Sequence, residues 1–177
     1  ALVTFRDKYL EKLEGLSDGK PMITDKMPQN FRYLGLLAAT FPEAKFVHVK
    51  RKPAAVCWAN FTTYFGANGL GYSCSLEDIV RYHGLYENLM DFWSERLGKQ
   101  IYTLDYDALT VDQEKETRQL INYLNLDWDE DCLLPEKNTR SVSTASLQQV
   151  RQKVYRGSSE KWRKYEPFLN GVFDNLM

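Results

Sequence analysis

Residues 41–53 read FPEAKFVHVKRKP, and the order of residue types along them predicts a turn, a strand and the start of a helix. The initial Phe-Pro-Glu-Ala run is typical of a turn. Residues 45–49 follow as a short, mainly apolar and β-branched run, which predicts a strand. Three basic residues then lead to Pro53, which suits the first turn of a helix over about 54–65, because that position needs no backbone N–H donor.

On both sides of this stretch, apolar periodicity and capping residues predict further elements. Helices are expected over residues 2–15, from Asn30 to about Thr40, over 75–97, from Asp112 to about Leu124, over 146–153 and from Pro167 onward. Two more strands are expected at 22–24 and 100–104, and residues 127–145 are expected to be irregular. Ser75, with Asp78 three residues later, is expected to cap the long helix. Because strands alternate with helices, we predict a three-layer α/β/α protein with a parallel sheet.

The composition of the 177-residue chain narrows the functional classes. Its 23 Lys and Arg residues balance 24 Asp and Glu residues, and a formal net charge of −1 excludes a strongly basic nucleic-acid binder. No apolar run approaches the roughly 18 residues of a membrane span. The 3 Cys residues lack a CxxC pair and there are only 2 His residues, so no metal site is expected. Reduced cysteines and the lack of a targeting segment predict a cytoplasmic protein.

The carboxyl ends of the three expected strands carry charged residues, and ligands of open parallel sheets bind at these ends. The residues are Asp25-Lys26, Lys50-Arg51 and Asp105-Tyr106, so two of the three ends are cationic. Arg51 also precedes a predicted helix N-terminus, whose N–H groups and dipole favour an anion. Either these cations bind a phosphate or sulfate group, or they are solvated strand ends. The residues alone leave both interpretations open.

A second basic cluster lies nearer the C-terminus. It contains Arg151, Lys153, Arg156, Lys161, Arg163 and Lys164, with Gly157-Ser158-Ser159 among them. A flexible Gly/Ser loop flanked by such side chains can close over phosphate oxygens. The alternative is a solvated face with Trp162 and Tyr165 packed inward.

Five segments, in order along the chain, resemble the sulfotransferases that use 3′-phosphoadenosine 5′-phosphosulfate (PAPS). Residues 41–53 resemble the strand, loop and helix that bind the 3′-phosphate in that family. Residues 23–31 (ITDKMPQNF) resemble the DK-x-P-x-N segment of the family, and residues 104–109 (LDYDAL) resemble its Y-E-x-L strand end. Residues 118–128 (RQLINYLNLDW) resemble the helix that follows, and residues 146–165 resemble the nucleotide lid. The resemblance is greatest to bacterial sulfotransferases that often carry tetratricopeptide repeats, which are relatives of the tyrosylprotein sulfotransferases.

The resemblance implies roles for particular residues. Lys26 matches the lysine that contacts the transferring sulfuryl group, and it is the expected catalytic residue. The expected cofactor-binding residues are Arg51 at the 3′-phosphate, Tyr106 beside the adenine, Ser146, Lys161 on the phosphate side of the lid and, on a weaker match, Arg156.

The resemblance also implies a fold and a reaction. Residues 1–177 would form one domain with the P-loop NTPase-like fold of the sulfotransferases, with an N-terminal helix within 1–19 and a helical lid and tail over 146–177. The enzyme would transfer a sulfuryl group from PAPS to a hydroxyl of a small molecule, carbohydrate or peptide tyrosine. It would release adenosine 3′,5′-bisphosphate and would need no metal. Neither a nucleic acid nor a membrane is an expected partner.

Two departures from the family pattern affect the expected activity. The family places a serine eight residues after the arginine, where this chain has Ala59, so a hydrogen bond of about 1.5–3 kcal/mol is missing. Asn60 and Thr62 are the candidates to replace it. The first strand, the 5′-phosphosulfate loop and the catalytic base of the family would lie upstream of residue 1, with tetratricopeptide repeats as a candidate part of the same protein.

We therefore expect an N-terminally truncated sulfotransferase that is incomplete for catalysis by itself. The alternative is a catalytically inactive nucleotide-binding or protein-interaction domain of the same fold.

Overall fold

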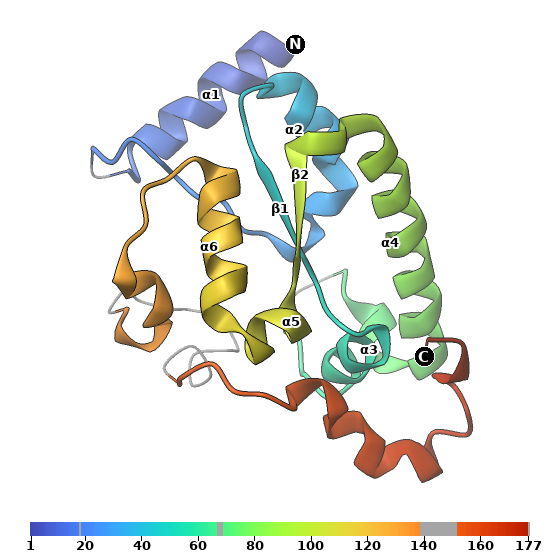
Figure 1. Cartoon of the computed structure of the whole chain (residues 1–177). Helices are drawn as coiled ribbons and strands as arrows, with labels where there is room; N and C mark the ends of the chain where they lie inside the picture. The colour runs from blue at the N-terminus through green and yellow to red at the C-terminus, as the bar shows by residue number, and fades with distance from the viewer. Residues whose placement is uncertain (18, 67–68, 139–151, 177) are drawn as a thin grey trace. The chain divides into compact units, whose positions relative to one another are not determined.

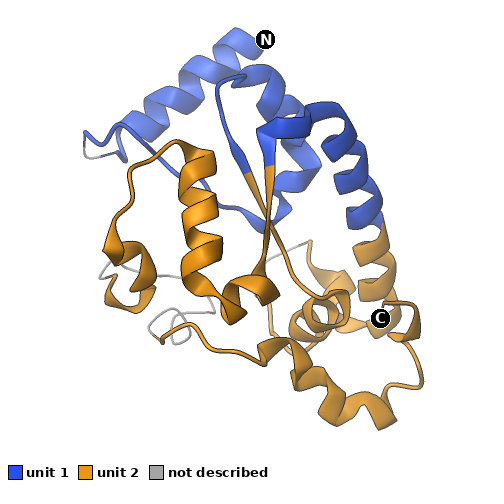
Figure 2. Cartoon of the chain, in the orientation of Figure 1, with its two compact units in different colours: residues 1–46, 85–101 blue, residues 47–84, 102–177 orange. Residues whose placement is uncertain are grey.

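The computed structural model describes residues 1–17, 19–66, 69–138 and 152–176. They belong to two compact units, coloured separately in Figure 2. Unit 1 comprises residues 1–46 and 85–101, and unit 2 comprises residues 47–84 and 102–177. Figure 1 labels the helices and strands in chain order.

Unit 1 is helical. It contains α1 (Leu2–Glu14), η1 (Pro28–Tyr33), α2 (Leu34–Thr40), η3 (Gly98–Gln100) and the C-terminal part of α4 (Leu76–Leu97), where η marks a 3-10 helix. The helix predicted over 2–15 is confirmed as α1, and the long helix predicted over 75–97 is confirmed as α4.

Aromatic rings join α1 to the end of α2. The ring centroid of Tyr9 lies 5.1 Å from that of Phe41, and Phe5 lies 5.9 Å from Tyr9. Arg6 donates to the carbonyl of Thr40 at 2.8 Å and pairs with Glu43, while its guanidinium lies 5.1 Å from the centre of the Phe41 ring. The apolar stripe of α1 therefore packs against the turn that precedes β1.

A glycine allows α2 and α4 to approach closely. A Cβ atom on Gly35 would lie 2.3 Å from the ring of Trp93, closer than any real contact allows. The Trp93 indole N–H in turn donates to the Phe31 carbonyl at 3.1 Å. Because Gly35 has no side chain, the large ring of Trp93 from α4 can pack directly against α2.

Unit 2 contains the sheet. Its two strands, β1 (Phe46–Lys50) and β2 (Ile101–Asp105), pair with each other and run in parallel, with Phe46 and Ile101 assigned to unit 1 (Figure 1). The helices are α3 (Pro53–Phe61), α5 (Tyr106–Val111), α6 (Gln113–Leu124), and the 3-10 segments η2 (Gly71–Cys74), η4 (Glu130–Leu133), η5 (Pro135–Lys137), η7 (Ser158–Phe168) and η8 (Asp174–Leu176). Two of the three predicted strands are therefore confirmed, each within one residue.

The core of unit 2 lies between α3, the start of α4 and the C-terminal segment. It is formed by buried side chains of Ala54, Ala55, Cys57, Ile79, Trp162, Leu169 and Phe173. Trp162 belongs to the same buried cluster as Ala54 and Ala55 of α3, and it meets Phe173 edge to face with ring centroids 5.6 Å apart. This packing fixes η7 against α3.

Local chemistry explains where several helices begin. Pro53 occupies the first turn of α3, as predicted. Ser75 Oγ accepts from the Asp78 backbone N–H at 3.2 Å, and Asp112 Oδ1 accepts from the Lys115 N–H at 3.2 Å, so both predicted caps are confirmed.

Three local predictions are wrong. Residues 22–24 do not form a buried strand: Met22 and Ile23 are 53% and 41% exposed, and a three-residue apolar run forms a strand only where a neighbour pairs with it. Asn30 does not cap a helix, because η1 begins earlier, at Pro28. Pro167 does not open the last helix; it lies inside η7, which starts after Gly157 at a φ of +83°.

Among the described residues, the helices and the possible metal ligands bear on membranes and metals. None of these helices has both the length and the apolar character needed to cross a bilayer. Within the same residues, no group of three or more His, Cys, Asp or Glu side chains could hold a metal ion. Most of the helix predicted over 146–153, including Ser146, lies outside the described residues.

Candidate functional site: the carboxyl ends of β1 and β2

Arg51 follows β1 directly and is the centre of the candidate site in unit 2. Its Nε donates a hydrogen bond to Ser159 Oγ at 2.8 Å, across 108 residues of sequence. Its guanidinium carbon also lies 5.2 Å from the centre of the Tyr106 ring. The half-buried arginine therefore meets a hydroxyl from η7 and an aromatic face from α5.

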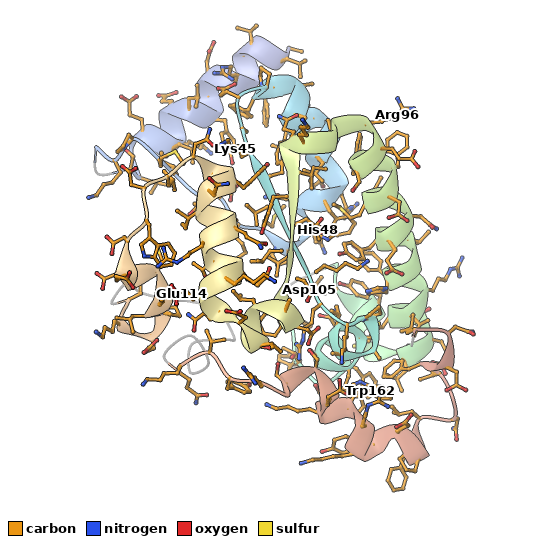
Figure 3. All side chains as sticks on the ribbon, viewed as in Figure 1. Lys45, His48, Arg96, Asp105, Glu114 and Trp162 are labelled. Atoms are coloured by element: carbon orange, nitrogen blue, oxygen red, sulfur yellow. The ribbon has the colours of Figure 1, made fainter. Side chains whose placement is uncertain are left out.

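Tyr106 is positioned by the cap of its own helix. Asp105, labelled in Figure 3 at the end of β2, accepts from the N–H groups of Asp107 at 2.8 Å and Ala108 at 3.0 Å. Asp107 in turn accepts from the backbone N–H of Lys52 at 3.0 Å. The two strand ends are thus tied together, since the start of α5 bonds to the residue that precedes α3.

Ser159 is held by the core of unit 2. It is only 3% exposed, and Trp162, three residues later and labelled in Figure 3, is 4% exposed. Tyr165 stacks on Trp58 of α3 with ring centroids 4.7 Å apart. Since Gly157 adopts a left-handed conformation just before η7, the chain turns there and presents Ser158 and Ser159 to Arg51 and Tyr106.

An ion-pair network adjoins this site. Glu160 pairs with Lys52 and with Arg163, whose Nε lies 2.5 Å from Glu160 Oε2. The hydrogen bond from Lys52, followed by that from Arg163, holds the pKa of Glu160 below its ordinary value. Within the described residues, no carboxylate forms an ion pair with Arg51 itself. Arg51 therefore keeps a charge that an anionic ligand could neutralise.

The other residues expected to bind the cofactor have different surroundings. Arg156 donates to the carbonyls of Thr110, at 3.2 Å, and Val111, at the C-terminal end of α5. Lys161 donates to the Tyr155 hydroxyl at 3.2 Å and lies 5.1 Å from the centre of that ring. Arg51 and Tyr106 are therefore close together, whereas Arg156 and Lys161 form hydrogen bonds with other residues of unit 2.

Lys26, the expected catalytic residue, belongs to unit 1 and is exposed. The carboxylate of its neighbour Asp25 accepts a hydrogen bond from the Tyr9 hydroxyl at 2.5 Å. Burial, then the hydrogen bond to Asp25 and its charge, raise the pKa of Tyr9 to about 12. The segment that carries Lys26 is therefore anchored to α1.

The chain has Ala59 where the family has a serine, so the hydroxyls of the neighbouring residues are of interest. Thr62, one of the two candidates, donates from its hydroxyl to the Trp58 carbonyl at 2.9 Å, within α3. The hydroxyl that contacts Arg51 instead comes from Ser159, which belongs to the Gly/Ser loop that the sequence predicts to close over phosphate oxygens but is not itself a predicted site residue. Its only signal in the sequence was the Gly-Ser-Ser run inside the second basic cluster.

Comparison with known proteins identifies the protein family to which the chain belongs. A family model described as the sulfotransferase family matches residues 2–130, so the chain belongs to the sulfotransferase family. An uncharacterized protein of Aquifex aeolicus (strain VF5) is 38% identical over 170 residues, which are 95% of this chain and 22% of that protein. The chain therefore spans about a fifth of the length of this relative. The matched family region includes β1, α3, β2 and α5, but not η7.

Proposed function

We propose that this chain forms part of a PAPS-dependent sulfotransferase and binds the 3′-phosphate side of the nucleotide at Arg51. The observation that carries the proposal is the pairing of Arg51 with a neutral hydroxyl and an aromatic face instead of a carboxylate. Nε is held by Ser159, and among the described residues no hydrogen bond from the terminal nitrogens is found, so these can donate to a phosphate in a charge-assisted contact. The ring of Tyr106, beside that group, suits stacking with the adenine.

The proposed reaction joins an acceptor hydroxyl to sulfur. The hydroxyl oxygen forms a new S–O bond, the bond between sulfur and the bridging phosphate oxygen breaks, and adenosine 3′,5′-bisphosphate leaves. By analogy with phosphoryl transfer, the protein contributes positioning and charge neutralisation. Lys26 would stabilise the charge that develops on the leaving phosphate, and the proton of the hydroxyl would pass to a base supplied outside residues 1–177.

The remaining assignments complete the proposed nucleotide site. Ser146, Lys161 and Arg156 would contact the nucleotide from the lid, and Lys161 would leave Tyr155 to do so. The residues that hold the 5′-phosphosulfate would come from elsewhere in the protein, and the sheet would be part of the three-layer, P-loop-like arrangement of the family. The acceptor would carry a hydroxyl, whether on a small molecule, a carbohydrate or a peptide tyrosine.

The direct test is calorimetric titration of the chain with adenosine 3′,5′-bisphosphate and, separately, with adenosine 5′-monophosphate. We expect tighter binding of the bisphosphate, and we expect Arg51→Ala to weaken it by about 2–3 kcal/mol, the scale of a charge-assisted contact. Arg118→Ala is the matched control, because Arg118 already pairs with Glu114 and stacks on Trp128. Equal affinity of folded wild type and Arg51→Ala for the bisphosphate would refute the assignment.

Sulfuryl transfer by the longer protein is the second measurement. Binding of the bisphosphate with no transfer from PAPS would favour an inactive nucleotide-binding domain, for which the Ala59 substitution is the observation in support.

A further inference from the structure

We infer that Ser159 orients Arg51 and donates a hydrogen bond of its own to the 3′-phosphate, in place of the hydroxyl that α3 lacks at Ala59. This inference rests on the proposed function and names a further residue of the same site. Ser159 lies in η7, beyond the region that the family model matches.

The first step is the geometry of the guanidinium. The hydrogen bond of 2.8 Å uses Nε, the nitrogen within the side chain, and leaves both terminal nitrogens for a ligand. A hydrogen bond at Nε together with the Tyr106 ring against one face of the guanidinium fixes the plane of the fork. A guanidinium with a fixed plane loses less side-chain entropy when it binds an anion.

The second step is the capacity of the hydroxyl. Ser159 Oγ accepts from Arg51, and a hydroxyl that accepts through a lone pair still has its O–H hydrogen to donate. At 3% exposure, this hydrogen has little access to bulk water, and a buried donor is stabilised by a specific acceptor. A phosphate oxygen that accepts from the terminal nitrogen of Arg51 on the same side as its Nε–H would be such an acceptor, and Arg51 and Ser159 would then donate to the same phosphate.

The third step is rigidity. Trp162, buried against Ala54, Ala55 and Cys57, anchors η7 three residues after Ser159. Position 59 lies on α3 itself, whereas Ser159 contacts Arg51 from η7, which packs on the same helix. The core residues around Trp162 therefore hold the Ser159 hydroxyl in place.

The neighbouring serine supplies a matched control. Ser158 Oγ lies 3.5 Å from the Tyr106 hydroxyl, a long and weak contact, and no hydrogen bond to Arg51 is recorded for it among the described residues. Ser158→Ala and Ser159→Ala therefore remove the same atom at adjacent positions, but only the second removes the contact with Arg51.

The experiment is calorimetric titration of the full chain with adenosine 3′,5′-bisphosphate and with adenosine 5′-monophosphate. We expect Ser159→Ala to weaken bisphosphate binding roughly tenfold, the equivalent of one hydrogen bond to a charged group, and to leave monophosphate affinity within about twofold. Ser158→Ala should bind both ligands like the wild type. Ser159→Thr, which restores the hydroxyl, should recover most of the lost affinity.

A double-mutant cycle tests the coupling. In an Arg51→Ala background, Ser159→Ala should cost much less than it does alone, because the two side chains act on one phosphate. If Ser159→Ala lowers the melting temperature sharply, Ser159→Cys keeps a side chain at this position with a slightly larger thiol, a weak hydrogen-bonding group, and it should show the same selective loss.

The outcomes separate the inference from the proposed function. Loss of bisphosphate binding in Arg51→Ala with no change in Ser159→Ala or Ser159→Cys overturns the role of Ser159 and leaves the nucleotide site in place. An equal loss for both ligands in Ser159→Ala also overturns it, since that result shows only a structural role. A wild-type chain that binds neither ligand overturns the inference together with the function on which it rests.

Discussion

Arg6 and Arg51 have similar aromatic surroundings and opposite polar ones. Arg6 lies 5.1 Å from the centre of the Phe41 ring in unit 1, and Arg51 lies 5.2 Å from that of Tyr106 in unit 2. The fork of Arg6 is taken by the Glu43 carboxylate and the Thr40 carbonyl, so its charge is already compensated. Arg51, among the residues that the structure describes, has a hydroxyl at its Nε and no carboxylate partner. The polar partner, and not the ring, distinguishes an arginine that joins two elements from one that can receive an anion.

The largest expected effect is on stability, and it comes from removing Trp162, which holds η7 and therefore Ser159 near Arg51. Trp162→Ala should destabilise the chain by about 3–5 kcal/mol, because it empties a buried position between α3 and η7. Urea unfolding followed by circular dichroism measures the change. Phe168→Ala, at a 79% exposed site in the same segment, is the control and should change stability by about 0.5 kcal/mol or less. Equal effects at the two positions would contradict the packing of η7.

The next effect compares the two arginines directly. Arg51→Lys keeps the positive charge but loses the planar fork and the Nε donor to Ser159, so bisphosphate binding should weaken about tenfold. Arg6→Lys makes the same replacement where the fork is already occupied, and the affinity should stay at the wild-type value. Titration calorimetry measures both. A larger loss for Arg6→Lys than for Arg51→Lys would reverse the comparison.

A smaller effect concerns the pH dependence of the Arg6–Glu43 pair. The hydrogen bond from Arg6 is the main cause that holds the pKa of Glu43 below its ordinary value of 4.5. A carboxylate with a depressed folded-state pKa stabilises the fold above its unfolded-state value, and this contribution disappears as the pH falls through the folded-state pKa. The melting temperature of Arg6→Ala should therefore lie slightly below that of the wild type at pH 7.

Lowering the pH gives the check on that pair. The difference in melting temperature should shrink as the pH falls from the region of 4.5 downward, because protonated Glu43 no longer pairs with Arg6. Glu43→Gln provides the second variant, and its melting temperature should show the same convergence with the wild type. A gap that is constant from pH 7 to pH 3 would assign the stability to the packing of Arg6 on Phe41.

The smallest effect is electrostatic. Glu160→Gln removes the carboxylate that pairs with Lys52 and Arg163, so the field near Arg51 becomes more positive. Bisphosphate affinity should rise modestly at low salt, and the gain should fade as added salt screens it. Glu166→Gln, which alters a longer contact of 3.6 Å with Arg163, should have a weaker effect. A decrease in affinity for Glu160→Gln would indicate that the ion-pair network orders the site.

Local structure follows from the sequence where neighbouring residues control the backbone. Pro53 predicted the first turn of α3, Asp112 predicted the start of α6, and the β-branched run before Arg51 predicted β1. Residues 22–24 do not form a strand, because apolar character does not provide a pairing strand. Pro167 does not open a helix, because a proline is also tolerated inside a 3-10 segment, and here it lies in the last turn of η7.

The cation after β1 and the starts of several helices could be predicted from residue types and their order, since caps, turns and periodicity act over a few positions. Membership of the sulfotransferase family followed from the resemblance of five segments to that family. The contact between Arg51 and Ser159 could not be predicted, because it joins residues 108 positions apart. Trp162 of η7 and the alanines of α3 belong to one buried cluster, and such packing depends on side-chain shapes from distant segments. The burial that holds Ser159 against Arg51 therefore belongs to the tertiary structure alone.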